Sequence, residues 1–385
     1  MSKAFDLTLH SLMFTKMLNA GVCPIFVRLL IHVYSHQEAN VRWNGVYSSN
    51  FSVKNGCGQG KVLAALAYCL YCEELFATLR RRHAGCWVMG RYMGMVGYSD
   101  DNWILAPSLS ALQDILKTCE EYAEKHNLKF STDVNPKKCK TKCMAFLFKP
   151  RKLPEMQLCG NPLPWVDSLV HLGTTVTNQL DGCQQDIKKK IARYIDRNCS
   201  LTQEFKFAHP KTLIKINDIY NCHFSGSQLW NLFSPGFVKF ESTFNKSIKI
   251  MAGLPIQTHR YMMEPVLGKE HMKLKLIRNY LGFVKALRNS TKYILKVLYK
   301  ISSRDVRTVT GSNLRNILLL TNEMQVDKLR PTMVDNISYK QIDESQMWRV
   351  PLVLEILDIQ HGVKNLGGEW TDEELKQILT TACTQ

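Results

Sequence analysis

Residues 95–104 read MVGYSDDNWI, and this stretch decides how the rest of the sequence is interpreted. Apolar residues flank a polar centre on both sides, which is the pattern of two short strands joined by a tight turn. The turn is predicted at Asp100-Asp101-Asn102, because Asp and Asn are favoured turn residues. Adjacent carboxylates at such a tip can bind hydrated Mg²⁺. An Asp-Asp pair in a turn is, however, far more often only a turn.

Helical and strand patterns alternate around this stretch and predict an α+β protein. Apolar residues at helical spacing predict helices over 7–19, 24–33, 61–82 and 110–126, the last with Ser110 and Gln113 as its capping box. Asn44-Gly45 between strand-like runs predicts a hairpin. Short strands are expected at 129–130 and 142–148, around the basic run KKCKTK.

Composition limits the class of protein and favours an anionic partner. The chain has 385 residues, 45% of them apolar, with a formal net charge of +17. These values exclude a disordered tail, a collagen-like polymer and a small disulfide scaffold. A charge this positive favours nucleic acid ahead of an anionic membrane, and the alternative is a generally basic, solvated surface.

The cysteines and the N-terminus favour a reducing compartment. The 13 cysteines are odd in number and have no paired framework, and Cys69 and Cys72 lie at helical spacing in an apolar run, where we expect core thiols rather than a metal site. No signal peptide and no stretch long enough for a transmembrane helix is found. We therefore expect a nuclear or cytoplasmic protein with no membrane partner, and find no sign of a protein partner.

An ordered set of motifs resembles the reverse transcriptases of non-LTR (LINE-type) retrotransposons over residues 1 to about 180. Tyr98-Ser99-Asp100-Asp101 is similar to the family's third motif, with Ser where Ala is usual. The other matching segments, in chain order, are SKAFD at 2–6, NGCGQG at 55–60, APS at 106–108, KTKCMAF at 140–146 and HLG at 171–173.

The resemblance implies a polymerase palm, in which an antiparallel sheet is packed against helices, followed by a mainly helical thumb and connection. It implies an RNA template, a DNA primer, deoxynucleotides and a two-ion Mg²⁺ site. The domains expected on this basis are a partial palm without fingers at 1–148, a β connector at 149–180, a basic helical thumb-like region at 181–310 and a more acidic helical tail at 311–385.

The resemblance also assigns roles to individual residues. Asp100 would be a metal ligand and Asp101 its supporting neighbour, and Lys138 or Lys140, between which the spacing does not choose, would protonate the leaving pyrophosphate. Phe5 would exclude a 2′-hydroxyl, and Gln59 and Gly60 would contact the nucleotide or template. The expected phosphate contacts are made by Lys188, Lys189, Lys190 and Arg193.

The sequence departs from the family pattern at one essential position. The family's first motif has a metal-binding Asp five residues before the aromatic, and counting back from Phe5 puts it one place before Met1. We therefore expect an N-terminally truncated domain with an incomplete metal site and strongly reduced activity. Three hypotheses remain open: an RNA-directed DNA polymerase, a noncatalytic nucleic-acid-binding remnant, and a helical protein adaptor.

Overall fold

The structure is a computed structural model that describes residues 4–58, 60–146, 152–179, 182–221, 224–268, 270–337, 349–360 and 371–384. The chain divides into two compact units, Met1–Val166 and Asp167–Gln385. Helices and short antiparallel strands occur together, which confirms the α+β prediction at that level. None of the helices described is long and apolar enough to cross a bilayer.

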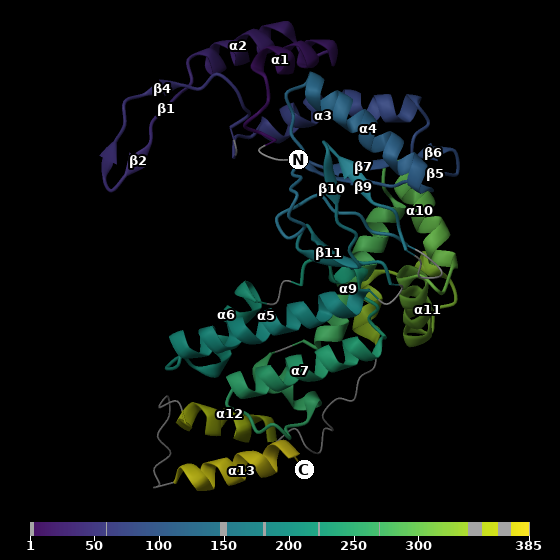
Figure 1. Ribbon diagram of the computed structural model, residues 1–385. Coiled ribbons are helices and arrows are strands. Elements are labelled where there is room, and N and C mark those ends of the chain that lie inside the picture. Colours follow the sequence, from purple (N-terminus) through teal and green to yellow (C-terminus); the bar gives the residue numbers. More distant parts are fainter. Residues whose placement is uncertain are drawn as a thin grey trace. The chain divides into compact units, whose positions relative to one another are not determined.

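The first unit contains four helices among its described residues, and its strands form hairpins (Figure 1). The helices are α1 (His10–Asn19), α2 (Pro24–Ser35), α3 (Ala64–Arg81) and α4 (Leu109–Lys125). The strands are β1 (Glu38–Ala39), β2 (Arg42–Trp43), β3 (Val46–Tyr47), β4 (Phe51–Ser52), β5 (Trp87–Val88), β6 (Arg91–Tyr92), β7 (Met95–Tyr98), β8 (Asp101–Ile104), β9 (Met156–Leu158) and β10 (Asn161–Leu163).

A half-buried lysine joins three helices of this unit. Lys16 on α1 donates hydrogen bonds to the backbone oxygen of Tyr71 (2.8 Å), to the hydroxyl of Tyr122 (2.7 Å) and to a carboxylate oxygen of Glu74 (3.1 Å). The Tyr71 hydroxyl in turn donates to the backbone oxygen of His126 at 2.6 Å. These bonds satisfy polar groups that would otherwise be costly to bury between α1, α3 and α4.

The second unit is mainly helical. Its strands β11 (Ser168–His171) and β12 (Thr174–Thr177) form one hairpin. The helices that follow are α5 (Cys183–Glu204), α6 (Pro210–Tyr220), α7 (Pro235–Met251), α8 (Met263–Leu267), α9 (Met272–Arg288), α10 (Tyr293–Arg304), α11 (Val309–Thr321), α12 (Arg349–Gln360) and α13 (Asp372–Thr384), with 3₁₀ turns at Ser227–Leu229, Arg260–Met262, Val326–Lys328 and Pro331–Asn336.

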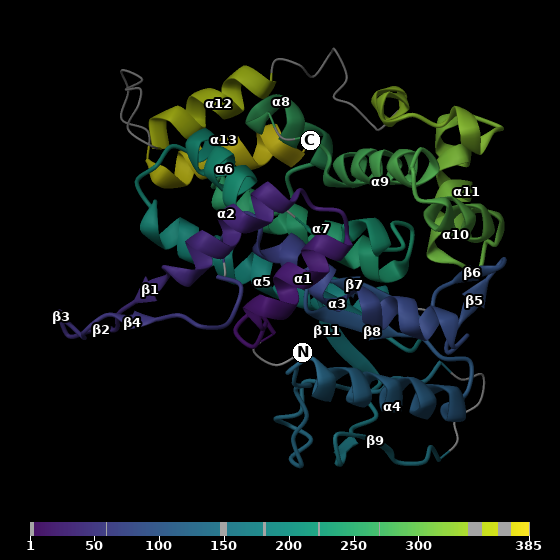
Figure 2. The same ribbon diagram turned by 90° about the horizontal axis from the view of Figure 1, so that it is seen from above.

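Aromatic side chains fill the core between α5 and α7, which lie side by side (Figures 1 and 2). Trp230, Phe237, Phe240 and Phe244 are all 1% exposed or less. Burying a side chain of this size stabilises a fold by about 1.5–3 kcal/mol. The second unit therefore has a hydrophobic core of its own.

Several sequence predictions agree with these elements and others are wrong. Asn44-Gly45 does turn a hairpin, with Arg42 opposite Tyr47. The expected antiparallel sheet is instead six separate two-stranded pairs among the described residues. Helix α4 begins at Leu109, one residue before the predicted start at 110, because Ser108, not Ser110, accepts the capping hydrogen bond from the Ala111 amide.

The basic run KKCKTK lies in a loop and not between strands. Residues 129–130 form no strand, and Cys143 makes only an isolated bridge with Trp165; residues 147–148 lie outside the described part of the chain. The loop is closed by local bonds, since the amides of Lys140 and Thr141 both donate to the Ser131 oxygen.

The boundary between the units falls inside the connector predicted at 149–180. Hairpin β9–β10 belongs to the first unit, where Met156 and Leu158 pack with Leu116 of α4. Hairpin β11–β12 belongs to the second unit, where the Thr175 amide donates to Asp186 of α5 at 2.8 Å. Each hairpin is therefore held by a different helix.

Candidate active site

The YSDD segment forms a two-residue turn between β7 and β8. Tyr98 pairs with Asp101 across the hairpin, so Ser99 and Asp100 are the loop residues. Ser99 has φ +57°, the positive value that tight hairpins require. The turn therefore lies one residue earlier than the predicted Asp100-Asp101-Asn102, and Asp101 and Asn102 begin β8. Asp101 is exposed and Asp100 is half-buried.

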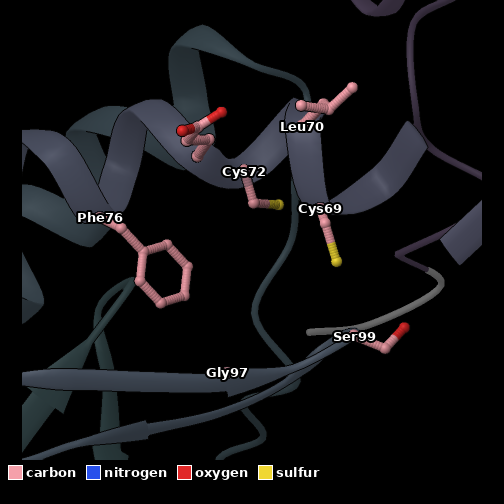
Figure 3. A pocket seen from close by; sticks show the side chains of 7 residues that line it. Cys69, Leu70, Cys72, Phe76, Gly97 and Ser99 are labelled. Atoms are coloured by element: carbon pink, nitrogen blue, oxygen red, sulfur yellow. The ribbon is translucent and has the colours of Figure 1, made fainter. Parts of the chain in front are cut away.

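Helix α3 covers one side of this hairpin and leaves a pocket beside the turn. The Phe76 ring points towards Gly97 (Figure 3), and a Cβ built on Gly97 would come within 2.9 Å of the ring. The same Cβ would lie 2.6 Å from the Asn102 side-chain oxygen, so a larger residue here would require the Asn102 and Phe76 side chains to move. The pocket has a volume of about 330 Å³ and is lined by Cys69, Leu70, Cys72, Glu73, Phe76, Gly97 and Ser99. Of the two thiols expected in the core, Cys72 is buried but Cys69 is exposed.

Tyr68 connects Asp100 with Phe5. The Tyr68 side chain is fully buried, and its ring centroid lies 4.9 Å from that of Phe5. Burial raises the pKa of the Tyr68 hydroxyl far above its usual value, and the negative charge of Asp100 raises that pKa further. Burial also raises the pKa of Cys72, which hydrogen-bonds with Tyr68, to about 11. The two predicted site residues Phe5 and Asp100 thus share one buried neighbour.

The segment around Phe5 also lies against the predicted glycine-rich loop. The Cys57 amide donates to the Phe5 oxygen at 2.7 Å, and the Gly56 amide donates to the Thr8 oxygen at 2.8 Å. Gly56 has φ +97°, and a Cβ there would lie 3.1 Å from backbone atoms of residues 5 and 6. Chain segments about 50 residues apart in sequence are therefore joined here.

The other predicted site residues of the first unit are only partly placed. Gln59 lies outside the described residues, and Gly60 is exposed with φ +83°. Lys138 and Lys140 are both exposed and lie on either side of the buried Cys139. The structure therefore does not favour one of these lysines over the other, and their role stays a prediction.

The run of lysines on α5 divides into two kinds of environment. Lys188, Lys189 and Arg193 are exposed. Lys190 instead pairs with the buried Asp186 at 2.9 Å, donates to the backbone oxygen of Ser225 and lies 5.5 Å from the Trp230 ring centroid. Its ammonium is thus held inside the second unit, so we leave Lys190 out of any nucleic-acid interface.

The two carboxylates at the hairpin tip are of the ligand type that Mg²⁺ prefers. Magnesium in phosphoryl-transfer sites is commonly held by one or two carboxylates together with substrate phosphates and water. Asp100 and Asp101 supply two such carboxylates, and the described residues contain no group of three or more metal-ligating side chains. Further ligands would therefore have to come from substrate and solvent, or from a carboxylate outside the described residues.

The sequence gives no direct sign that α3 packs against both Phe5 and the β7–β8 hairpin. Tyr68, Cys72 and Phe76 are spaced by four residues and lie on one face of this helix, towards Phe5 and the hairpin. Their spacing could have indicated a packed face. It could not have shown which partner that face meets.

Comparison with known proteins identifies the family of this chain. The family model described as "Reverse transcriptase (RNA-dependent DNA polymerase)" matches residues 1–196, about half of the chain. A Drosophila melanogaster protein described as "Probable RNA-directed DNA polymerase from transposon X-element" is 22% identical over 267 residues, which is 65% of this chain and 27% of that protein. The resemblance to non-LTR retrotransposon enzymes is thereby confirmed. Because this family model matches half of its length, the chain belongs to the reverse transcriptase family.

Proposed function

We propose that residues 4–166 form a palm-like unit for RNA-templated DNA synthesis, with Asp100 and Asp101 as magnesium ligands. The observation that carries this proposal is the Asp100-Asp101 pair at a hairpin turn, in the same unit where Phe5 packs on Tyr68 and accepts a hydrogen bond from Cys57 of the glycine-rich loop. Bound Mg²⁺ would activate the primer 3′-hydroxyl and stabilise the leaving pyrophosphate. Phe5 would then limit the space beside the sugar, and Lys138 or Lys140 would donate a proton to the pyrophosphate.

A primer-extension assay with an RNA template, a DNA primer and Mg²⁺ tests this proposal. Residues 1–385 supply two carboxylates at the tip, so we expect weak incorporation, which should increase when an aspartate is added directly before Met1. Asp100→Asn should lower incorporation by about 100-fold or more, since a metal ligand contributes several kcal/mol to the transition state.

Asp114→Asn is the matched control, because Asp114 is an exposed carboxylate of the same unit on α4. It should leave incorporation unchanged. Equal incorporation by the Asp100→Asn variant and the unmodified chain would overturn the proposal, as would the absence of incorporation from both the unmodified and the aspartate-extended chains.

A second candidate function is nucleic-acid binding without catalysis. The exposed cations of α5 favour it, because Lys188, Lys189 and Arg193 lie within two turns of one helix. Phosphate contacts release counterions, so binding through these residues must weaken as salt rises. We propose this surface as the contact with the template–primer backbone.

Salt titration of RNA binding measures the contribution of each cation. Lys188→Gln, Lys189→Gln and Arg193→Gln should each lower the slope of log affinity against log salt by about 1. Arg307→Gln serves as a control, because Arg307 is exposed but already paired with Asp305 at 2.8 Å. If the α5 variants keep the slope of the unmodified chain, the phosphates are bound elsewhere.

A further inference from the structure

A hairpin arm extends from α2 and buries none of its side chains in a core. The arm comprises residues 38–52, with β1 paired to β4 and β2 paired to β3 (Figures 1 and 2). The described hydrophobic clusters contain no side chain from it. Isolated two-stranded hairpins are marginally stable in water, so this arm depends on its own hydrogen bonds.

Those hydrogen bonds link the two sides of the arm. The Ser48 amide donates to the Val41 oxygen and the Val41 amide to the Ser48 hydroxyl, both at 2.9 Å. The Asn40 side-chain amide donates to the side-chain oxygen of Asn50 at 3.2 Å, and the Asn50 side-chain amide donates to the Glu38 carboxylate at 3.1 Å. The side chains at the tip are therefore presented on a preformed scaffold.

The tip of the arm, residues 42–47, exposes aromatic rings on both faces. Trp43 is 77% exposed and lies opposite Val46, so these two share one face. Tyr47 is 58% exposed and lies opposite Arg42 on the other face. The Arg42 guanidinium is 5.5 Å from the Tyr47 ring centroid. This contact keeps a positive charge at the tip.

We infer that this tip binds single-stranded nucleic acid by stacking unpaired bases on Trp43 and Tyr47, with Arg42 near a phosphate; the inference rests on the proposed action on an RNA template. Exposed aromatics next to cations are the usual means of holding single strands without sequence preference. The position of the charges agrees with this partner, because the one cation of the arm, Arg42, lies at its tip and its one acid, Glu38, lies in the β1–β4 pair away from the tip.

The neighbouring exposed face of α2 has a different character and is not part of this site. Its exposed apolar side chains are mostly aliphatic, with one aromatic, Phe26, which is 41% exposed; the aliphatic ones are Ile25, Leu29, Ile31 and Val33. Aliphatic side chains offer no π face for a base. A partner that recognised apolar area alone would contact Val46 as well as Trp43, whereas stacked bases need the Trp43 ring. Substitutions at these two positions therefore test the inference.

Binding of the full chain to an oligouridine probe and to an RNA–DNA duplex tests the arm. Trp43→Ala and Tyr47→Ala should each weaken oligouridine binding by about 10-fold or more, with an unchanged salt slope and unchanged duplex affinity. Trp43→Phe should restore most of the affinity. Val46→Ala is the matched control, since Val46 is 71% exposed on the same face as Trp43, and it should bind like the unmodified chain.

Three results would overturn the inference. If Trp43→Ala binds oligouridine as tightly as the unmodified chain, the arm does not stack bases, while nucleic-acid binding by the chain stands. If Trp43→Ala and Val46→Ala lose affinity equally, or both abolish self-association in sedimentation velocity, the arm is an apolar protein contact. If the unmodified chain binds neither probe at low salt, the proposed function and the inference both fail.

Discussion

Replacing Asp186 with leucine is expected to lower the free energy of unfolding of the second unit by about 3–5 kcal/mol. The Asp186 carboxylate is 2% exposed and accepts hydrogen bonds from the Thr175 amide at 2.8 Å and the Trp230 indole at 2.7 Å, besides its ion pair with Lys190. Leucine would leave the Thr175 amide and the Trp230 indole without an acceptor and Lys190 without its counter-ion, and each unsatisfied buried group carries its full desolvation cost.

Urea unfolding of the full chain, followed by circular dichroism, measures this effect. Adjacent lysines provide the comparison: Lys190→Met should destabilise the unit, while Lys189→Met should change the free energy of unfolding by no more than about 0.5 kcal/mol, because Lys189 is exposed. If both lysine variants behave alike, the buried ion pair does not stabilise the unit as described.

Gly85→Ala is expected to destabilise the first unit by about 3–5 kcal/mol, which combines backbone strain with a steric clash. Gly85 has φ +110°, and a Cβ there would lie 2.6 Å from the Gly94 Cα and 3.0 Å from the Leu105 oxygen. Both neighbours are backbone atoms and cannot rotate away. Backbone hydrogen bonds next to Gly85 join the two hairpins β5–β6 and β7–β8. The Cys86 amide donates to the Leu105 oxygen, and the Leu105 amide donates to the Gly94 oxygen.

Gly90→Ala is the matched control for this prediction. Gly90 also has a positive φ, +71°, but no atom lies within 4 Å of a Cβ built on it. Alanine there should cost only about 1 kcal/mol of backbone strain. Equal destabilisation by the two variants in thermal or urea unfolding would show that the approach of Gly85 to Gly94 does not constrain the fold.

Local signals in the sequence were sufficient for several elements. Asn44-Gly45 predicted its hairpin correctly, because a two-residue turn with positive φ needs such residues. The Asp100-Asp101 hairpin was also predicted, but its turn was placed one residue late. Asp and Asn are turn residues in general, whereas the position of the turn depends on which residues pair, and here Tyr98 pairs with Asp101.

Pairing between distant segments could not be predicted from these local signals. The strands expected at 129–130 and 142–148 looked like other short apolar runs, but the loop between them closes on Ser131 instead. The expected sheet became separate hairpins for the same reason, since strand-like residues do not specify their partners. The packing of Tyr68 on Phe5 likewise depends on two segments that are distant in sequence.

The sequence alone determined the family, the acidic pair at a hairpin tip and the basic character of the chain, because each depends on residue type and order along the chain. Only the tertiary structure decided which charges are available. Lys188, Lys189 and Lys190 are three lysines in a row, yet Lys190 forms an ion pair with Asp186 while the other two are exposed to solvent. A helix rotates each successive residue by about 100°, so neighbours in a run face different surroundings, and those surroundings come from distant parts of the fold.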